Sequence, residues 1–149
     1  MSDDIAAFYR SFADYTLSGS APLYEAVVRS AADNPEVMVL VAEAPAEAHV
    51  PNNLHAAVHY LLLSGADHPL AAAYQPGFQG DIGSLFCDFV LAHRGEILDL
   101  LSTRYVQTNE VNRTAAIAPL LNRIAAQESA SLAMIDVGCS AGLNLLLDR

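Results

Sequence analysis

Basic side chains are scarce in this sequence: among its 149 residues, 7 Lys and Arg stand against 17 Asp and Glu, which leaves a net charge of −10. Proteins gain much of their affinity for nucleic acid by neutralising phosphates and releasing counterions, so this chain is not expected to bind nucleic acid. The same deficit disfavours binding to anionic membranes. We therefore expect its partner to be a small-molecule cofactor or substrate.

Long apolar runs and secretion signals are also missing. No apolar stretch approaches the roughly 20 residues that a membrane-spanning helix needs. The N-terminal residues Met1-Ser2-Asp3-Asp4 are acidic and lack the basic and apolar regions of a signal peptide. Only two cysteines are present, Cys87 and Cys139, and they are too far apart to form a metal-type pair. A reduced, cytoplasmic protein is the expectation.

The composition, 53% hydrophobic and 16% charged, is typical of a globular chain that can bury a sizeable core. Apolar residues recur mostly at helical spacing, with Asn34-Pro35 as a break and Asp81 as a helix cap. The run over 37–42 fits either a strand or a helix, and we favour a helix because Ala and Glu follow it. We expect helices around residues 5–15, 22–33, 37–42, 51–64, 82–101 and 117–124.

The last residues follow a different pattern. Residues 134–137 are typical of a buried strand, 138–142 of a glycine-rich turn, and 143–147 of the helix that follows. This order opens a Rossmann-like α/β domain, in which the turn presents backbone N–H groups to a ligand. The predicted fold is therefore mainly α: a helical, bundle-like domain over 1–130, then the start of a truncated Rossmann-like domain over 131–149.

The glycine turn supports two enzymatic hypotheses. The favoured one is the opening motif of a Rossmann-like methyltransferase, in which small residues let the backbone approach S-adenosylmethionine. Ser140 stands where the usual pattern has its middle glycine, and the acidic residue expected about 20 positions later would lie beyond Arg149. No catalytic residue is assigned. The predicted cofactor contacts are Asp136, Gly138, Cys139, Ser140, Gly142 and Asn144.

The alternative is the G-x-S-x-G elbow of an α/β-hydrolase, with Ser140 as the nucleophile of an esterase. The literal match is complete, but an elbow normally follows several strands and a Gly-rich oxyanion loop. The preceding 130 residues read as helices and contain no such loop. A third possibility is a non-catalytic helical binding module, in which the turn is purely structural.

A second polar cluster spans residues 107–113, shortly after Arg104 and Tyr105. It can be a helix start, with Thr108 or Asn109 as cap and Glu110 in the first turn. It can also be a recognition loop in which Thr108, Asn109 and Glu110 bind a substrate. Both interpretations can hold together.

His55 and His59 are four residues apart on a predicted helix, which is a spacing found in metal sites. The residues between them are Ala-Ala-Val, so the glutamate of the H-E-x-x-H motif is absent. No third ligand is indicated, although Glu43, Glu47 and His49 are near in the sequence. We expect ordinary packing and no metal.

Three segments together resemble an uncharacterised bacterial family with a helical N-terminal half and a methyltransferase-like Rossmann half. They are residues 51–62 (PNNLHAAVHYLL), 107–111 (QTNEV) and 136–145 (DVGCSAGLNL). The resemblance implies that the glycine turn touches the cofactor, that the loop from Thr108 to Glu110 lies near it, and that this chain is an N-terminal part. It implies no substrate.

A truncated Rossmann sheet has physical consequences. One parallel strand cannot bury itself or pair its own backbone groups. We therefore expect residues 132–137 to lie against the helical part or to be poorly ordered. The leucines at 145–147 should expose an apolar patch that invites self-association. The 149-residue chain by itself should have no catalytic activity.

Overall fold

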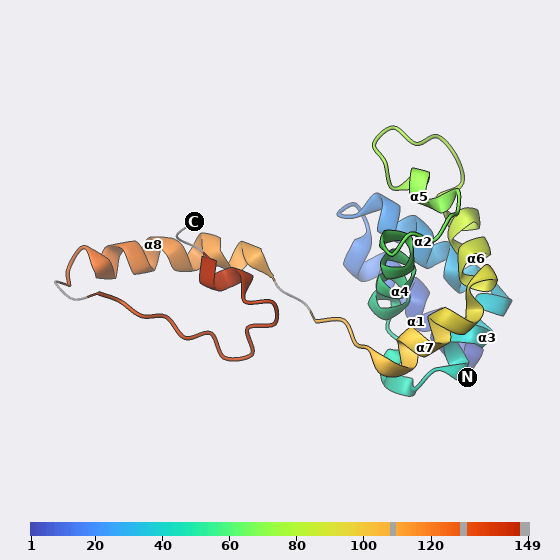
Figure 1. Ribbon diagram of the computed structural model, residues 1–149, viewed down its shortest axis with the longest axis horizontal. Coiled ribbons are helices and arrows are strands. Elements are labelled where there is room, and N and C mark those ends of the chain that lie inside the picture. Colours follow the sequence, from blue (N-terminus) through green and yellow to red (C-terminus); the bar gives the residue numbers. More distant parts are fainter. Residues whose placement is uncertain (108–109, 129–130, 147–149) are drawn as a thin grey trace. The chain divides into compact units, whose positions relative to one another are not determined.

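The computed structural model describes residues 1–107, 110–128 and 131–146 and is mainly helical, which confirms the predicted class (Figure 1). The chain divides into two compact units, Met1–Val106 and Gln107–Arg149. The sequence placed a domain boundary near residue 130. The units separate earlier because the helix before residue 130 packs with the C-terminal segment of its own unit.

The first unit is built from seven α-helices and two short turns of other helical types. The turns are a π-helical turn, Ala13–Leu17, and a 3-10 turn, Ala46–Ala48. The helices are α1 (Ser2–Phe12), α2 (Pro22–Asp33), α3 (Pro35–Glu43), α4 (Pro51–Leu63), α5 (Leu70–Ala73), α6 (Ile82–Ala92) and α7 (Arg94–Thr103). None of the described helices is long and apolar enough to span a bilayer.

Proline and polar caps set where these helices begin. Proline is the first residue of α2, α3 and α4, where its missing N–H costs no helical hydrogen bond. Asn34 caps α3 because its Oδ1 accepts the N–H of Val37 at 3.2 Å. Asp81 caps α6 in the same way, accepting the N–H of Ser84 at 3.0 Å, as the sequence predicted. The ambiguous run over 37–42 is helical, as favoured.

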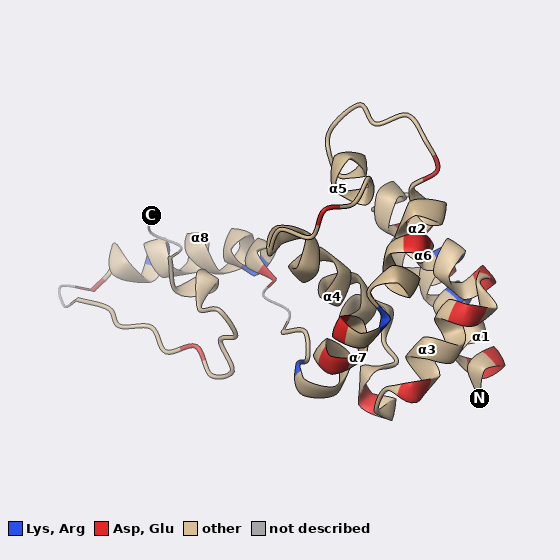
Figure 2. Cartoon of the chain, turned by 45° about the vertical axis from the view of Figure 1, so that its right-hand side comes forward, with Lys and Arg blue, Asp and Glu red and all other residues tan. Residues whose placement is uncertain are grey.

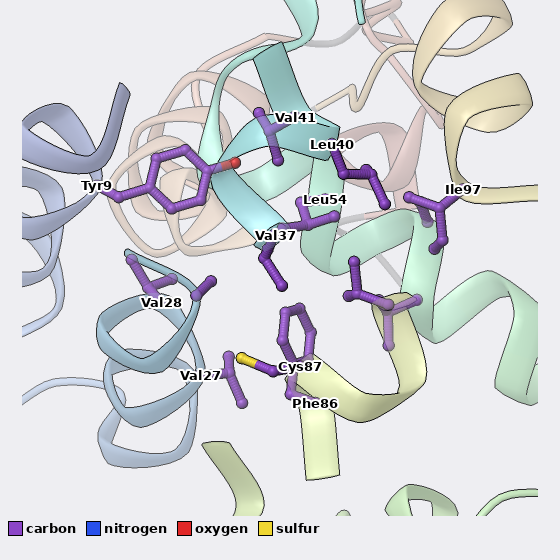
Figure 3. Close-up of a cluster of buried hydrophobic side chains, with 14 of the residues drawn as sticks. Tyr9, Val27, Val28, Val37, Leu40, Val41, Leu54, Phe86, Cys87 and Ile97 are labelled. Carbon is purple, nitrogen blue, oxygen red and sulfur yellow. The ribbon is translucent and has the colours of Figure 1, made fainter. Parts of the chain in front are cut away.

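The core lies where α2 packs against α6 and α1, with α3 and α4 also contributing (Figure 3). Val27, Val37 and Phe89 are fully buried, and Phe86 is buried next to Cys87. Acidic residues occur on several helices, including α1, α3 and α7, rather than in one cluster (Figure 2). Burial of apolar surface in this core is the main stabilising contribution to the first unit.

The long helix predicted over 82–101 is wrong in one respect, because it is broken at His93. The backbone of His93 has φ −107° and ψ 29°, outside the helical region, and separates α6 from α7. Gly95, which disfavours helix, follows the break. The apolar periodicity continues across it, with Phe89 and Ile97 both fully buried, so the pattern alone gave no sign of two helices.

The second unit contains a 3-10 turn, Val111–Arg113, then α8 (Thr114–Ala125) and a further 3-10 turn, Leu143–Leu146. None of the described side chains of α8 is buried. The predicted last helix is present, and two of its apolar side chains, Leu120 and Ile124, are exposed. The leucine patch predicted over 145–147 is exposed at Leu145 and Leu146, and Leu147 lies outside the described residues.

The strand predicted over 134–137 is not formed: the described residues from 131 to 136 are irregular, and a turn begins at Val137. Ile135 and Val137 are 88% and 92% exposed. The physical reason is the one the sequence suggested, since a single strand has no neighbour to pair its backbone groups. Residues 132–134 instead lie along α8 and share a hollow with Leu121, Asn122 and Ala125.

Asn53 ties the start of α4 to the end of the first unit. Its side chain is buried, its Oδ1 accepts the N–H of Val106 at 3.0 Å, and its Nδ2 donates to the Glu47 carbonyl at 3.4 Å.

We expect Asn53→Ala to lower the free energy of unfolding by about 1–2 kcal/mol, because Val106 loses a buried acceptor. Urea denaturation measures this change. Asn122→Ala, on an exposed position of α8, is the control, and equal effects of the two variants would contradict the prediction.

Candidate functional site

The glycine loop contains three residues in the left-handed region, separated by single residues. Gly138 has φ 75°, Ser140 has φ 54° and Gly142 has φ 72°. Glycine adopts this conformation without strain, whereas a side chain there costs roughly 1–2 kcal/mol. Ser140 is the one non-glycine residue with positive φ in the part of the chain that the structure describes. Its backbone therefore explains why a glycine is expected at this place, and the serine is strained.

Hydrogen bonds close the loop onto the turn that follows. The N–H of Gly142 donates to the Cys139 carbonyl at 2.8 Å, and the N–H of Leu145 donates to the Gly142 carbonyl at 3.0 Å. The side chain of Ser140 is exposed, and those of Asp136 and Cys139 are half-buried. The loop therefore presents its backbone and the Ser140 hydroxyl to the solvent.

Asn144 follows the loop and is buried, with 8% of its surface exposed. Its Oδ1 is fully buried and has no hydrogen-bond partner among the described residues. A buried acceptor without a donor costs roughly 1–3 kcal/mol, and native proteins rarely leave one. Asn144 is therefore an unsatisfied buried acceptor directly after the glycine loop.

Two of the three predicted substrate contacts, Thr108 and Asn109, lie outside the described residues. The third, Glu110, has an Oε1 that accepts the N–H of Asn112 at 3.0 Å and so caps the turn Val111–Arg113. A helical turn does begin here, but Glu110 is its cap, whereas the helix-start interpretation had placed Glu110 within the first turn. The same turn packs against the turn Leu143–Leu146, so this polar segment and the end of the glycine loop are brought together within the second unit.

The histidine pair of α4 belongs to an aromatic cluster in the first unit. The His55 ring lies 4.5 Å from Tyr24 and 6.2 Å from Phe86, and the His59 ring stacks 5.2 Å from Tyr74, all between centroids. Burial, with a smaller contribution from the neighbouring His59, lowers the pKa of His55 to about 4. Burial also raises the pKa of Tyr74 to about 12. His55 is therefore a neutral packing residue at pH 7.

Metal-ligating side chains do not gather in the described parts of the chain, where no three His, Cys, Asp or Glu residues form a potential site. His49, which lies near the pair in sequence, uses its Nε2 to contact the Ala44 carbonyl at 2.9 Å. Glu43 forms an ion pair with Arg94. Both side chains are thus occupied by contacts within the fold.

A pocket of about 210 Å³ in the first unit, which no sequence motif indicates, brings Asn53 and Tyr60 of α4 next to Arg104 after α7. Arg104 was noted only because it precedes a polar segment. Its partner Tyr60 is far away in the sequence, and no local pattern links the two residues.

One family model matches residues 6–149, and its description is "Uncharacterized protein conserved in bacteria (DUF2332)". No curated protein and no solved structure matches the chain.

Proposed function

Because the chain belongs to this bacterial family, whose description names no activity, we propose a function from the glycine loop: the protein is methyltransferase-like and binds S-adenosylmethionine there. The observation that carries the proposal is the alternation of left-handed residues at 138, 140 and 142. A left-handed residue beside a right-handed one aims successive N–H groups into a concavity that suits an anionic group such as a carboxylate. The N–H of Gly142 already donates to the Cys139 carbonyl, so the loop would offer its earlier N–H groups to the ligand.

The residues of the loop fit this ligand. Gly138 and Gly142 have no Cβ, and a Cβ added at either would meet no atom within 4 Å, so the backbone is open to a close approach. Asn144, directly after the loop, has a buried Oδ1 without a partner among the described residues, and it would need to become accessible to accept from an ammonium, amino or hydroxyl group of the ligand. The proposed contacts are Asp136, Gly138, Cys139, Ser140, Gly142 and Asn144.

The bound cofactor would supply an electrophilic methyl group, which passes to a nucleophilic acceptor as the carbon–sulfur bond breaks. The chain's contribution would be positioning and exclusion of water. Positioning requires a rigid loop, and the residues before this loop, 131–136, are irregular instead of forming a strand within a sheet. We therefore expect the 149-residue chain by itself to show no methyl transfer in a turnover assay.

Calorimetry of the protein with S-adenosylmethionine and S-adenosylhomocysteine tests the proposal. Gly142→Val should weaken binding about 10-fold or more, because a β-branched residue at φ 72° strains the loop by roughly 1–3 kcal/mol. Ser140→Gly should bind at least as well as the wild type, because it relieves strain. Gly77→Val is the matched control, since Gly77 has φ 84° and lies in the first unit. Absence of binding to both ligands would refute the proposal.

The hydrolase alternative is kept because of one observation: Ser140 is both left-handed and exposed, as a nucleophile on a strained turn should be. A fluorophosphonate probe separates the two proposals. The hydrolase predicts labelling of Ser140 that Ser140→Gly abolishes. The methyltransferase-like protein predicts no labelling and unchanged or improved cofactor binding in the same variant.

A further inference from the structure

The pocket of the first unit combines an apolar floor with a charged rim. Ala57 and Leu100 are buried, at 6% and 8% exposure, and Ala56 lies beside them on α4. Tyr60 and Arg104 also line the pocket, and both side chains are exposed. At about 210 Å³ the pocket is smaller than the roughly 300–1,000 Å³ of sites for drug-sized molecules, so it suits a small ligand.

Arg104 lies over an aromatic ring. Its guanidinium carbon lies 4.7 Å from the centroid of the Tyr60 ring, which is a cation–π contact. A guanidinium carries five N–H donors in a planar fork, and a cation–π contact does not require any of them to form a hydrogen bond. The chain thus presents an oriented, bidentate donor beside an apolar floor.

Arg104 also differs from the other arginines of the first unit. Arg10 pairs with Asp33 at 2.8 Å, Arg29 pairs with Asp14 and Glu25 at 2.8 Å each, and Arg94 pairs with Glu43. Arg104 has no carboxylate partner within the described residues. In a chain with 17 acidic residues, a cation held in a pocket without a carboxylate is an available anion receptor.

An interaction with the helix dipole of α7 accounts for only part of the position of Arg104. Arg104 directly follows α7, where a positive charge interacts favourably with the helix dipole. That role needs neither the stacking on Tyr60 nor the hollow beside it. The side-chain amide of Asn53, which also lines the pocket, is already used at both ends by Val106 and Glu47. Arg104 is therefore the charged group with which this pocket can recognise a ligand.

We propose that this pocket binds a small organic monocarboxylate, with the carboxylate on Arg104 and a short apolar or aromatic body over Ala57 and Leu100. Guanidinium and carboxylate match in bidentate geometry. A single arginine and a net charge of −10 disfavour dianions such as phosphate esters. This inference goes beyond the proposed function and does not depend on the glycine loop.

Benzoate and benzamide are the probes, because they share a ring and differ in charge. Titration of the isotope-labelled 149-residue chain should shift the amide signals of Ala56, Ala57 and Leu100. We expect benzoate to bind with a Kd of about 1–10 mM, as for one charge-assisted contact on an apolar surface, and benzamide to bind about 5-fold or more weakly. Raising the salt concentration should weaken benzoate binding only. Equal binding of the two probes, or no shifts at these residues, would overturn the proposal.

Variants of the pocket distinguish a role of Arg104 in carboxylate binding from a role in stabilising α7 through the helix dipole. Arg104→Gln should abolish the preference for benzoate, and Arg104→Lys, which keeps the charge but loses the fork, should weaken benzoate about 3-fold or more. Arg123→Gln removes the same charge from α8 and should keep the preference. Ala56→Leu should fill the pocket and weaken both probes while leaving Arg104 in place. Benzoate preference that survives in Arg104→Gln, or unchanged binding in a folded Ala56→Leu variant, would contradict the proposal.

Discussion

Replacing Gly83 with alanine should lower the free energy of unfolding of the first unit by about 2–3 kcal/mol. Gly83 is buried at the second position of α6, where this helix packs against α2. A Cβ added there would lie 1.8 Å from the Oγ of Ser30 and 2.6 Å from its Cβ. Rotation of Ser30 can move the hydroxyl but not the Cβ, so the two helices must separate. A close-packed interior does not absorb such a shift without cost.

The chain offers a matched control in Gly95, which is the second residue of α7 and where an added Cβ would meet no atom within 4 Å. Gly95→Ala should stabilise the chain by up to about 1 kcal/mol, since alanine favours helix. Because both glycines occupy the same helical position, the difference between the two variants isolates the contact with Ser30. Urea denaturation followed by circular dichroism measures both changes.

A compensating variant tests the assigned contact directly. Ser30→Gly removes both atoms that the new Cβ would meet, so it should recover about 1 kcal/mol or more of the loss in Gly83→Ala, despite its own cost in helix preference. If Gly83→Ala were as mild as Gly95→Ala, or if Ser30→Gly gave no recovery, the close approach of α2 and α6 would not be what Gly83 provides.

Features with local causes were predictable from the sequence. Pro35 and Pro51 begin helices because proline fits the first turn, and Asn34 and Asp81 cap helices because their side chains accept backbone N–H groups. The break at His93 was not predictable in this way. The spacing of buried apolar residues continues from α6 through His93 into α7, so this spacing does not separate the two helices.

The candidate sites also combine features that the local sequence predicts with features that depend on the fold. The glycine turn is a local motif, and the positive φ of Ser140 explains why the usual pattern has a glycine at this position. The strand before it depends on neighbouring strands, so its sequence pattern alone did not produce it. The pocket at Arg104 depends on Tyr60 and Leu100, which come from different helices, and only the fold brings them together.

Acid should destabilise this protein through His55, whose pKa is lowered to about 4 by burial and by the neighbouring His59. In the unfolded chain the pKa of a histidine is about 6.5, so between these values the unfolded state binds more protons than the folded state. Stability due to a neutral His55 is therefore fully present above about pH 6.5, falls as the pH drops, and is lost near pH 4. The loss is on the order of 3 kcal/mol at most, because solvent reaches part of the ring.

Two variants isolate this contribution from the many carboxylates that titrate below pH 5. His55→Phe keeps a ring among Tyr24, Tyr74 and Phe86 and removes the buried Nδ1 that lacks a partner, so it should not destabilise the chain at pH 7. It should flatten the fall in stability between pH 6.5 and pH 4. His59→Asn should raise the pKa of His55 by removing a like charge and should flatten the fall less. Urea denaturation at several pH values and NMR titration of the imidazole measure both effects, and a His55 that titrates near pH 6.5 would contradict them.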